Sequence, residues 1–165
     1  MANFETSTRV HTYLRPGQFE FKDLSHLDGL GQLRAVFEGD APPPPIASTL
    51  GFTRFHAERG RTEVTITVEE FHYNPSGTVH GGIIAAILDT AAGTAVHSLL
   101  EVGESFTSLD LTIKFLRPLT LASGEIRALG EVIHRGRRTA LGKGQLYDSS
   151  GKLAAHALST CMILG

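Results

Sequence analysis

The chain has 165 residues, which fits one domain of ordinary size. Hydrophobic residues make up 41% and charged residues 19%, a composition that excludes an intrinsically disordered chain. The net charge of −2 argues against a nucleic-acid binder, and the single cysteine, Cys161, excludes a disulfide framework and favours a reducing, cytoplasmic location.

The first 45 residues differ from the rest of the chain. Leu27, Leu30, Leu33 and Phe37 have helical spacing, and a glycine follows them as a helix stop. The next feature is a run of four prolines, 42–45, which predicts a stiff polyproline II linker. We therefore expect an N-terminal appendage with one short helix over residues 1–45 and one globular domain over residues 46–165.

From Leu50 onward the pattern becomes that of β-structure. The segments 50–58 and 61–69 are predicted strands, and Arg59-Gly60 between them predicts a hairpin turn. The segment 80–100 is apolar nearly all round, which predicts a buried helix. A membrane span is not expected there, because Asp89 and two histidines within the segment would be costly in lipid.

Four strand-like runs follow the helix. In the first, apolar residues at 109, 111, 113 and 115 alternate with polar ones, which predicts one strand. The other three runs are 125–134, 139–147 and 152–164. The expected fold is α+β, with an antiparallel sheet wrapped around one buried helix.

The densest cluster of candidate site residues runs from His72 to Gly82, at the start of the predicted helix. Gly81 and Gly82 would leave backbone N–H groups open at a helix N-terminus, where they stabilise negative charge as an oxyanion hole does. A glycine-rich entry turn without any ligand is the alternative. Eight residues further on, Asp89 stands alone among apolar residues. A carboxylate there either satisfies a buried donor or serves as a general base or nucleophile.

The spacing of these two features predicts how a site could be assembled. Gly81 and Asp89 are about 12 Å apart along a helix axis, so one carbonyl carbon cannot touch both. A second copy with its helix antiparallel would bring Asp89 of one chain near Gly81 of the other. The spacing therefore suggests a homodimer with shared sites.

Basic residues are concentrated between residues 112 and 145. Seven lysines and arginines stand there against two glutamates, and Arg137 and Arg138 lie in a predicted turn. A solvated turn explains any single arginine, whereas the cluster suits a phosphate-bearing partner. The sequence has no nucleophile elbow, no phosphate-binding glycine loop and no zinc-ligand spacing, so we expect neither a metal nor a cofactor.

The motif Asn74-Pro75-x-Gly77-x-x-His80-Gly81-Gly82, followed by Asp89, resembles that of the PaaI-type hot-dog-fold acyl-CoA thioesterases. The segments 114–118 and 136–138 are also typical of that family, and the resemblance covers roughly residues 50–164. It implies a hot-dog fold, an acyl-CoA substrate, and dimers commonly paired into tetramers.

The resemblance also implies roles for individual residues. Asp89 would attack the thioester carbonyl or activate water, and the Gly81 N–H would polarise the carbonyl oxygen. Asn74 would stand near the same carbonyl or the water, and Ser108, opening the strand after the helix, would orient the water. The remaining implied site residues contact the substrate or hold the turn: His80, Gly82, Arg137 and Arg138.

The sequence thus predicts hydrolysis of an acyl-CoA thioester to a free acid and coenzyme A. A hot-dog protein that binds acyl-CoA without hydrolysing it is the alternative. A hot-dog dehydratase ranks lower, because His80 and Asp89 are nine residues apart and lie on different helical turns. The acyl group stays open, and acyl-carrier protein could replace coenzyme A.

Overall fold

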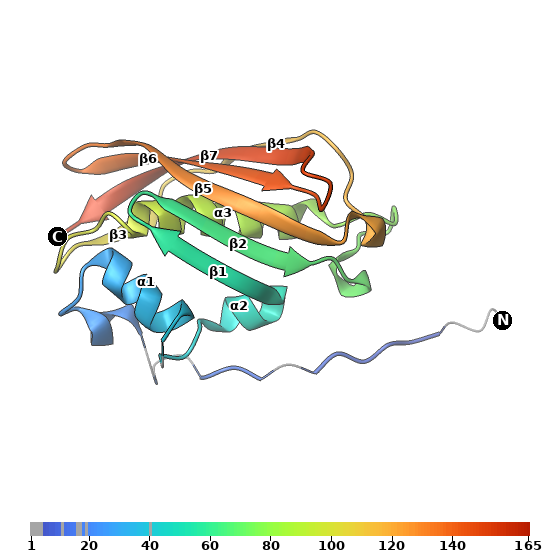
Figure 1. Ribbon diagram of the computed structural model, residues 1–165, viewed down its shortest axis with the longest axis horizontal. Helices are drawn as coiled ribbons and strands as arrows, with labels where there is room; N and C mark the ends of the chain where they lie inside the picture. The colour runs from blue at the N-terminus through green and yellow to red at the C-terminus, as the bar shows by residue number, and fades with distance from the viewer. Residues whose placement is uncertain (1–4, 11, 16–17, 19, 40) are drawn as a thin grey trace.

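One curved sheet wraps around a single long helix in this protein (Figure 1). The computed structural model describes residues 5–10, 12–15, 18, 20–39 and 41–165. Helix α3 (Gly81–His97) lies in the concave face of a seven-stranded, fully antiparallel sheet. The strands, in spatial order, are β1 (Phe52–Glu58), β2 (Arg61–Thr67), β5 (Glu125–Arg135), β6 (Thr139–Tyr147), β7 (Leu153–Leu164), and then both β3 (Ser105–Ser108) and β4 (Thr112–Phe115) against β7. This confirms the expected α+β architecture.

Glycines in the middle strands let the helix backbone lie directly on the sheet. A Cβ atom on Gly130 of β5 would stand 2.0 Å from the Ala91 carbonyl oxygen, and one on Gly142 of β6 would stand 2.9 Å from that of Ala92. Ala91 and Ala92 are themselves fully buried. The sequence analysis did not assign these strand glycines a role, because the helix that approaches them is about 40 residues away in the sequence.

The predicted hairpin at Arg59-Gly60 is confirmed, and Gly60 has the positive φ of +77° that such a turn requires. The Gly60 N–H donates to Ser98 Oγ at 2.7 Å, which ties the turn to the end of α3. The predicted start of the first strand at Leu50 is wrong, since Leu50 ends helix α2 (Pro45–Leu50). Gly51, with φ +76°, separates that helix from β1.

The predicted single strand over residues 109–115 is also wrong. Ser108 pairs with Cys161 and Thr112 with Leu158, so four steps along one strand oppose three along the other. The extra residue is a β-bulge that separates β3 from β4. Leu109, at the start of the predicted strand, lies outside both β3 and β4 and is 53% exposed.

Hydrogen bonds from strand β7 hold this bulge in place. The Thr160 N–H donates to Asp110 Oδ1 at 2.9 Å, and Ser159 Oγ donates to the Asp110 carbonyl oxygen at 2.8 Å. The Leu109 N–H donates to the Thr160 carbonyl oxygen at 2.8 Å. Within this clamp, Ser159 is fully buried, whereas the hydrogen bond between Thr160 and the Asp110 carboxylate is exposed to solvent.

The described part of residues 1–45 packs against the domain. It contains the 3-10 helix η1 (Phe21–Leu24) and helix α1 (Gly29–Phe37), which matches the predicted short helix. Leu33 of α1 is fully buried, and the Gly29 N–H donates to the Leu100 carbonyl oxygen at 2.9 Å. The division of the chain after residue 45 stays a prediction, and residues 1–4, 11, 16, 17, 19 and 40 lie outside the described part.

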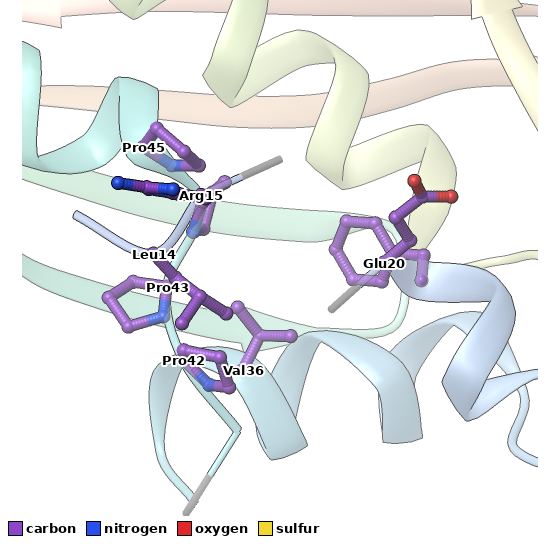
Figure 2. A pocket seen from close by; sticks show the side chains of 9 residues that line it. Leu14, Arg15, Glu20, Val36, Pro42, Pro43 and Pro45 are labelled. Atoms are coloured by element: carbon purple, nitrogen blue, oxygen red, sulfur yellow. The ribbon is translucent and has the colours of Figure 1, made fainter. Parts of the chain in front are cut away.

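The proline run is not a linker throughout, because Pro45 is the first residue of α2. Proline is tolerated at this position since the first N–H of a helix has no intrahelical acceptor. Figure 2 shows Leu14 beside Pro43, with Pro42 and Val36 nearby, around a cavity of about 90 Å³.

The structure also contains two short 3-10 helices in loops of the domain, η2 (Glu70–His72) and η3 (Leu121–Ser123). Among the described residues, no helix has the length and apolarity to cross a membrane.

Candidate active site

The loop before α3 is shaped by Asn74. Its side-chain oxygen accepts hydrogen bonds from the backbone N–H groups of Ser76 at 2.9 Å and Thr78 at 3.3 Å. Its amide nitrogen donates to Thr78 Oγ1 at 3.0 Å. Gly77, with φ +76°, closes the turn. The Asn74 side chain therefore holds the loop in this structure.

His80 caps the N-terminus of α3. Its Nδ1 accepts from the Gly82 N–H at 2.9 Å, and its backbone N–H donates to the His72 carbonyl oxygen at 2.8 Å. His72 is buried, and its two ring nitrogens are hydrogen-bonded to the Glu69 N–H and the Leu50 carbonyl oxygen. It therefore stabilises the turn from the protein interior. His80 thus holds the turn and engages the Gly82 N–H, which leaves the neighbouring N–H as the open donor.

That open donor is the Gly81 N–H, which has no hydrogen-bond acceptor among the described residues. Gly81 is the first residue of α3, and the Phe115 ring lies 3.4 Å from the position that a Gly81 Cβ would occupy. Gly81, Phe115 and Arg117 line a cleft of about 310 Å³. A free N–H at a helix N-terminus beside a cleft can stabilise a developing oxyanion.

Asp89 lies two turns further along α3. It is half-buried in the single chain. Ser108 Oγ donates to Asp89 Oδ1 at 3.4 Å. Ser108 is the last residue of β3, whereas the sequence analysis expected it to open a strand. The two side chains are therefore brought together, and the hydroxyl can hold a water beside the carboxylate.

Gly81 and Asp89 are not brought together within one chain. Both belong to α3, and eight residues of helix separate them by about 12 Å. Each faces the edge formed by β3 and β4, since Gly81 contacts Phe115 and Asp89 contacts Ser108. The donor and the carboxylate thus lie on the same side of the helix.

Arg137 and Arg138 are exposed in the turn between β5 and β6. This turn lies at the end of α3 opposite Gly81 (Figure 1), and the Arg138 carbonyl oxygen accepts from the Ile163 N–H at 2.9 Å. Their neighbour Arg135 is paired with Glu104. Arg137 and Arg138 have no ion-pair partner in the described part of the chain, so both guanidinium groups are free to bind an anion.

His97 near the other end of α3 was missed as a candidate site residue. It is 6% exposed, and burial lowers its pKa from 6.5 to about 4. Its Nε2 lies 2.8 Å from Oε1 of Gln32, a buried residue of α1. The helix sequence alone carries no signal for this contact, because Gln32 is 65 residues away.

Cys161, predicted to pack in the interior, is fully buried on β7. Burial raises the pKa of its thiol, and the nearby Asp89 carboxylate adds to that rise. The residues that the structure describes contain no group of three histidine, cysteine, aspartate or glutamate side chains that could hold a metal ion.

Comparison with known proteins places these features in a family. Residues 76–155 match the model of the Thioesterase superfamily. Acyl-coenzyme A thioesterase 13 of Pongo abelii is 30% identical over 130 residues, which cover 78% of this chain and 91% of that protein.

Two solved structures share both fold and sequence with the chain. A phenylacetic acid degradation-related protein from Ralstonia eutropha has a TM-score of 0.69 at 36% identity, covering 76% of this chain and 94% of that one. The E. coli PaaI protein has a TM-score of 0.70 at 28% identity, covering 86% of this chain and 96% of that one. The sheet and central helix described above are the hot-dog fold of these thioesterases.

Proposed function

The chain belongs to the thioesterase superfamily, and we propose that it hydrolyses an acyl-CoA thioester to a free carboxylic acid and coenzyme A. The names of several of its relatives state thioesterase activity. The choice of coenzyme A as the thiol rests on Arg137 and Arg138, whose side chains are exposed and without ion partners.

One observation carries the proposal. The Gly81 N–H is an unpaired donor at the N-terminus of the same helix that presents the Asp89 carboxylate beside the Ser108 hydroxyl. Hydrolysis of a thioester needs a donor for the oxyanion and a base for the water or a nucleophile. Both are present, and a reactive thioester carbonyl requires little more.

The chemical steps follow from these groups. The Gly81 N–H donates to the carbonyl oxygen of the thioester and stabilises the negative charge that forms there. Asp89 takes a proton from a water that Ser108 orients, and the water oxygen bonds to the carbonyl carbon. The C–S bond then breaks, the carboxylic acid forms, and the coenzyme A thiolate leaves and takes up a proton. Direct attack by Asp89, giving an anhydride that water then hydrolyses, uses the same groups.

We place Gly81 and Asp89 of each site on two copies of the chain. The outer edge of β3 has no neighbouring strand in the described sheet, so a second copy could pair there. Leu109, Phe115 and Leu116 are each more than half exposed along that edge. Covering these apolar side chains with a second copy favours a homodimer, in which antiparallel α3 helices would close the 12 Å gap. A tetramer would pair two such dimers.

Asn74 and His80 act as positioning residues in this proposal. Asn74 fixes the loop, and His80 fixes the first turn of α3, so that the Gly81 N–H stays exposed to the cleft. Gly82 contributes its N–H to His80 Nδ1, and so helps to fix the first turn of α3.

A thiol-release assay across aryl and aliphatic acyl-CoAs of graded length tests the function. Asp89→Ala should lower kcat by about 10²- to 10⁴-fold while the fold is retained, because Asp89 is half-buried and, among the described residues, its side chain bonds only to Ser108. Full turnover in that variant would contradict the assignment. Binding of acyl-CoA without any thiol release would support the non-hydrolytic alternative.

A pair of variants isolates the Gly81 N–H. Gly81→Pro removes the N–H at a helix position that accepts proline, and His80 before it already has the extended ψ of 135° that a following proline requires. Gly81→Ala adds a Cβ against Phe115 but keeps the N–H. The proline variant should be slower than the alanine variant by about 10²- to 10³-fold in kcat. Equal rates in the two variants would exclude the N–H as the oxyanion donor.

A further inference from the structure

A cavity of about 380 Å³ lies where the N-terminal segment meets the end of α3 and the start of β3. Its volume is in the range of small-molecule pockets. Its walls come from η1, α1, α3 and the segment that leads into β3, and include Phe21, Gln32, His97, Glu104 and Phe106. No residue of this cavity belongs to the thioester-cleaving groups described above.

The hydrogen bonds around His97 fix which of its ring nitrogens carries the proton. Gln32 Nε2 donates to the carbonyl oxygens of Leu24 at 3.3 Å and Leu27 at 3.1 Å, so Gln32 Oε1 faces His97 as an acceptor. His97 Nε2 must therefore carry the hydrogen that bonds to Gln32. His97 is neutral near pH 7, because its pKa is about 4.

The other ring nitrogen of His97 is consequently an acceptor. No described residue donates a hydrogen bond to His97 Nδ1, although the residue is only 6% exposed. Two rings flank the imidazole, Phe21 with its centroid at 4.6 Å and Phe106 at 5.6 Å. His97 lines the cavity, so this unpaired acceptor belongs to a buried lining residue that stands between two aromatic rings.

The charged groups around the cavity are already paired. Glu104 is bonded to Arg135, which lowers the pKa of the Glu104 carboxyl, and Lys22 Nζ lies 2.8 Å from Glu20. Lys22 is exposed at the rim. The interior therefore favours an uncharged occupant that carries a hydrogen-bond donor, and it disfavours a carboxylate.

The cavity lies on the same face of α3 as Asp89. Asp89, Gly93 and His97 are spaced at i, i+4 and i+8, and all three face β3. The Phe106 ring covers Gly93, 3.4 Å from where its Cβ would be, and so forms the wall between Asp89 and the cavity. Asp89 and His97 are about 12 Å apart along the axis of α3, which is the length of about ten bonds in an extended acyl chain.

From these contacts we propose that the cavity receives the far end of the acyl group, and that His97 Nδ1 accepts a hydrogen bond from a terminal hydroxyl on it. The acyl group runs from Asp89 past the edge of the Phe106 ring. The N-terminal segment, through Phe21 and Gln32, closes the cavity and so sets the length and polarity of the substrate. This inference rests on the proposed function, since it takes the acyl thioester as the ligand.

Three substrates test the inference in the wild-type chain: butyryl-CoA, decanoyl-CoA and ω-hydroxydecanoyl-CoA. We expect ω-hydroxydecanoyl-CoA to have a kcat/KM about fivefold above that of decanoyl-CoA, the gain from one net hydrogen bond. If butyryl-CoA and decanoyl-CoA are hydrolysed but the hydroxylated substrate is not preferred, the inference is overturned while the proposed function stands. Absence of thiol release from all three would instead contradict the proposed function.

His97→Gln is the matched variant, because the glutamine amide can still donate to Gln32 but offers no acceptor at the Nδ1 position. In His97→Gln, the ratio of kcat/KM for ω-hydroxydecanoyl-CoA to that for decanoyl-CoA should fall to about 1. His56→Gln makes the same change at an exposed histidine of β1 and should keep the wild-type preference. A preference retained in His97→Gln would overturn the inference.

A binding measurement covers the case in which turnover is absent or His97→Gln does not fold. The wild-type chain labelled with ¹⁵N-histidine is titrated with the ω-hydroxydecyl thioether of coenzyme A, which cannot be hydrolysed. The His97 Nδ1 resonance should shift with this probe and much less with the decyl thioether. Equal shifts with both probes, or none with either, would overturn the inference.

Discussion

Ser108 and Phe115 face the same helix although they are seven positions apart, an odd number, along one edge of the sheet. Ser108 contacts Asp89 and Phe115 contacts Gly81, both on α3. Side chains of a regular strand alternate between faces, so an unbroken strand would turn one of the two away. The bulge between β3 and β4 adds the residue that restores both contacts.

The bulge depends on Asp110, whose carboxylate accepts the Thr160 N–H. Asp110→Ala removes that acceptor and should cost about 1 kcal/mol of unfolding free energy. It should also lower kcat, because Ser108 loses its fixed place beside Asp89. Asp110→Asn keeps a side-chain oxygen and should retain most of the unfolding free energy and most of kcat. Urea unfolding and turnover measured on the two variants check this, and an alanine variant equal to wild type would count against the clamp.

Close packing of α3 on the sheet depends on Gly130. Gly130→Ala places a Cβ 2.0 Å from the Ala91 carbonyl oxygen, so the helix must move. The unfolding free energy should fall by about 3 kcal/mol. Gly165→Ala serves as control, because its nearest neighbour is the flexible Glu104 side chain at 3.4 Å. Chemical denaturation of both variants measures the difference, and similar stabilities would contradict the packing account.

Burial of His97 predicts how stability depends on pH. Its pKa falls from 6.5 to about 4 on folding, so between these values the unfolded state binds more protons. Stability should therefore drop as the pH falls below about 6.5, with a loss of about 3 kcal/mol completed below about pH 4. The charged groups at the same cavity are Lys22 and Glu104, each with its own ion partner.

His97→Gln removes this titration. The difference in unfolding free energy between wild type and His97→Gln should thus shift by about that amount, in favour of the variant, as the pH is lowered from 7 to 4. Denaturant titrations at several pH values measure the difference. A difference that does not change with pH would show that His97 is not the group responsible.

The free guanidinium groups of Arg137 and Arg138 predict that their removal affects a substrate with phosphate groups more than one without them. Replacing both by glutamine should raise KM for an acyl-CoA about tenfold, since two phosphate contacts are lost. The N-acetylcysteamine thioester of the same acyl group lacks phosphates, so its kcat/KM should stay near the wild-type value. Raised salt should weaken acyl-CoA binding in the wild type and much less in the double variant. Equal losses with both substrates would place the arginines away from the nucleotide.

The sequence was sufficient for features set by local pattern. Arg59-Gly60 between two strand-like segments predicted the β1–β2 hairpin, and an apolar run predicted α3, because period and turn chemistry act over few residues. The β3–β4 bulge was not predictable, since the residues that clamp it, Ser159 and Thr160, lie about 50 residues further along the chain. Without the bulge, the alternation from Leu109 to Phe115 was interpreted as one continuous strand.

The candidate site shows the same division. The motif around Gly81 and Asp89 could be found because its members share one helix and one loop. The cavity at His97 could not, because Gln32 and Phe21 reach it from the N-terminal segment, which lies outside the motif that carries the family resemblance. Helix α1 was expected in an appendage, whereas Leu33 and Val36 are buried, which only the packed chain reveals.

The central claim is that each active site takes its Gly81 N–H from one copy of the chain and its Asp89 carboxylate from the other. Gly81→Pro and Asp89→Ala, each nearly inactive alone, can be unfolded together in equal amounts and refolded. Half of the resulting dimers should be mixed, and each mixed dimer should contain one intact site. The account predicts recovery of about a quarter of the wild-type rate of thiol release. No recovery above the two parent variants, with mixed dimers shown to be present, would contradict it.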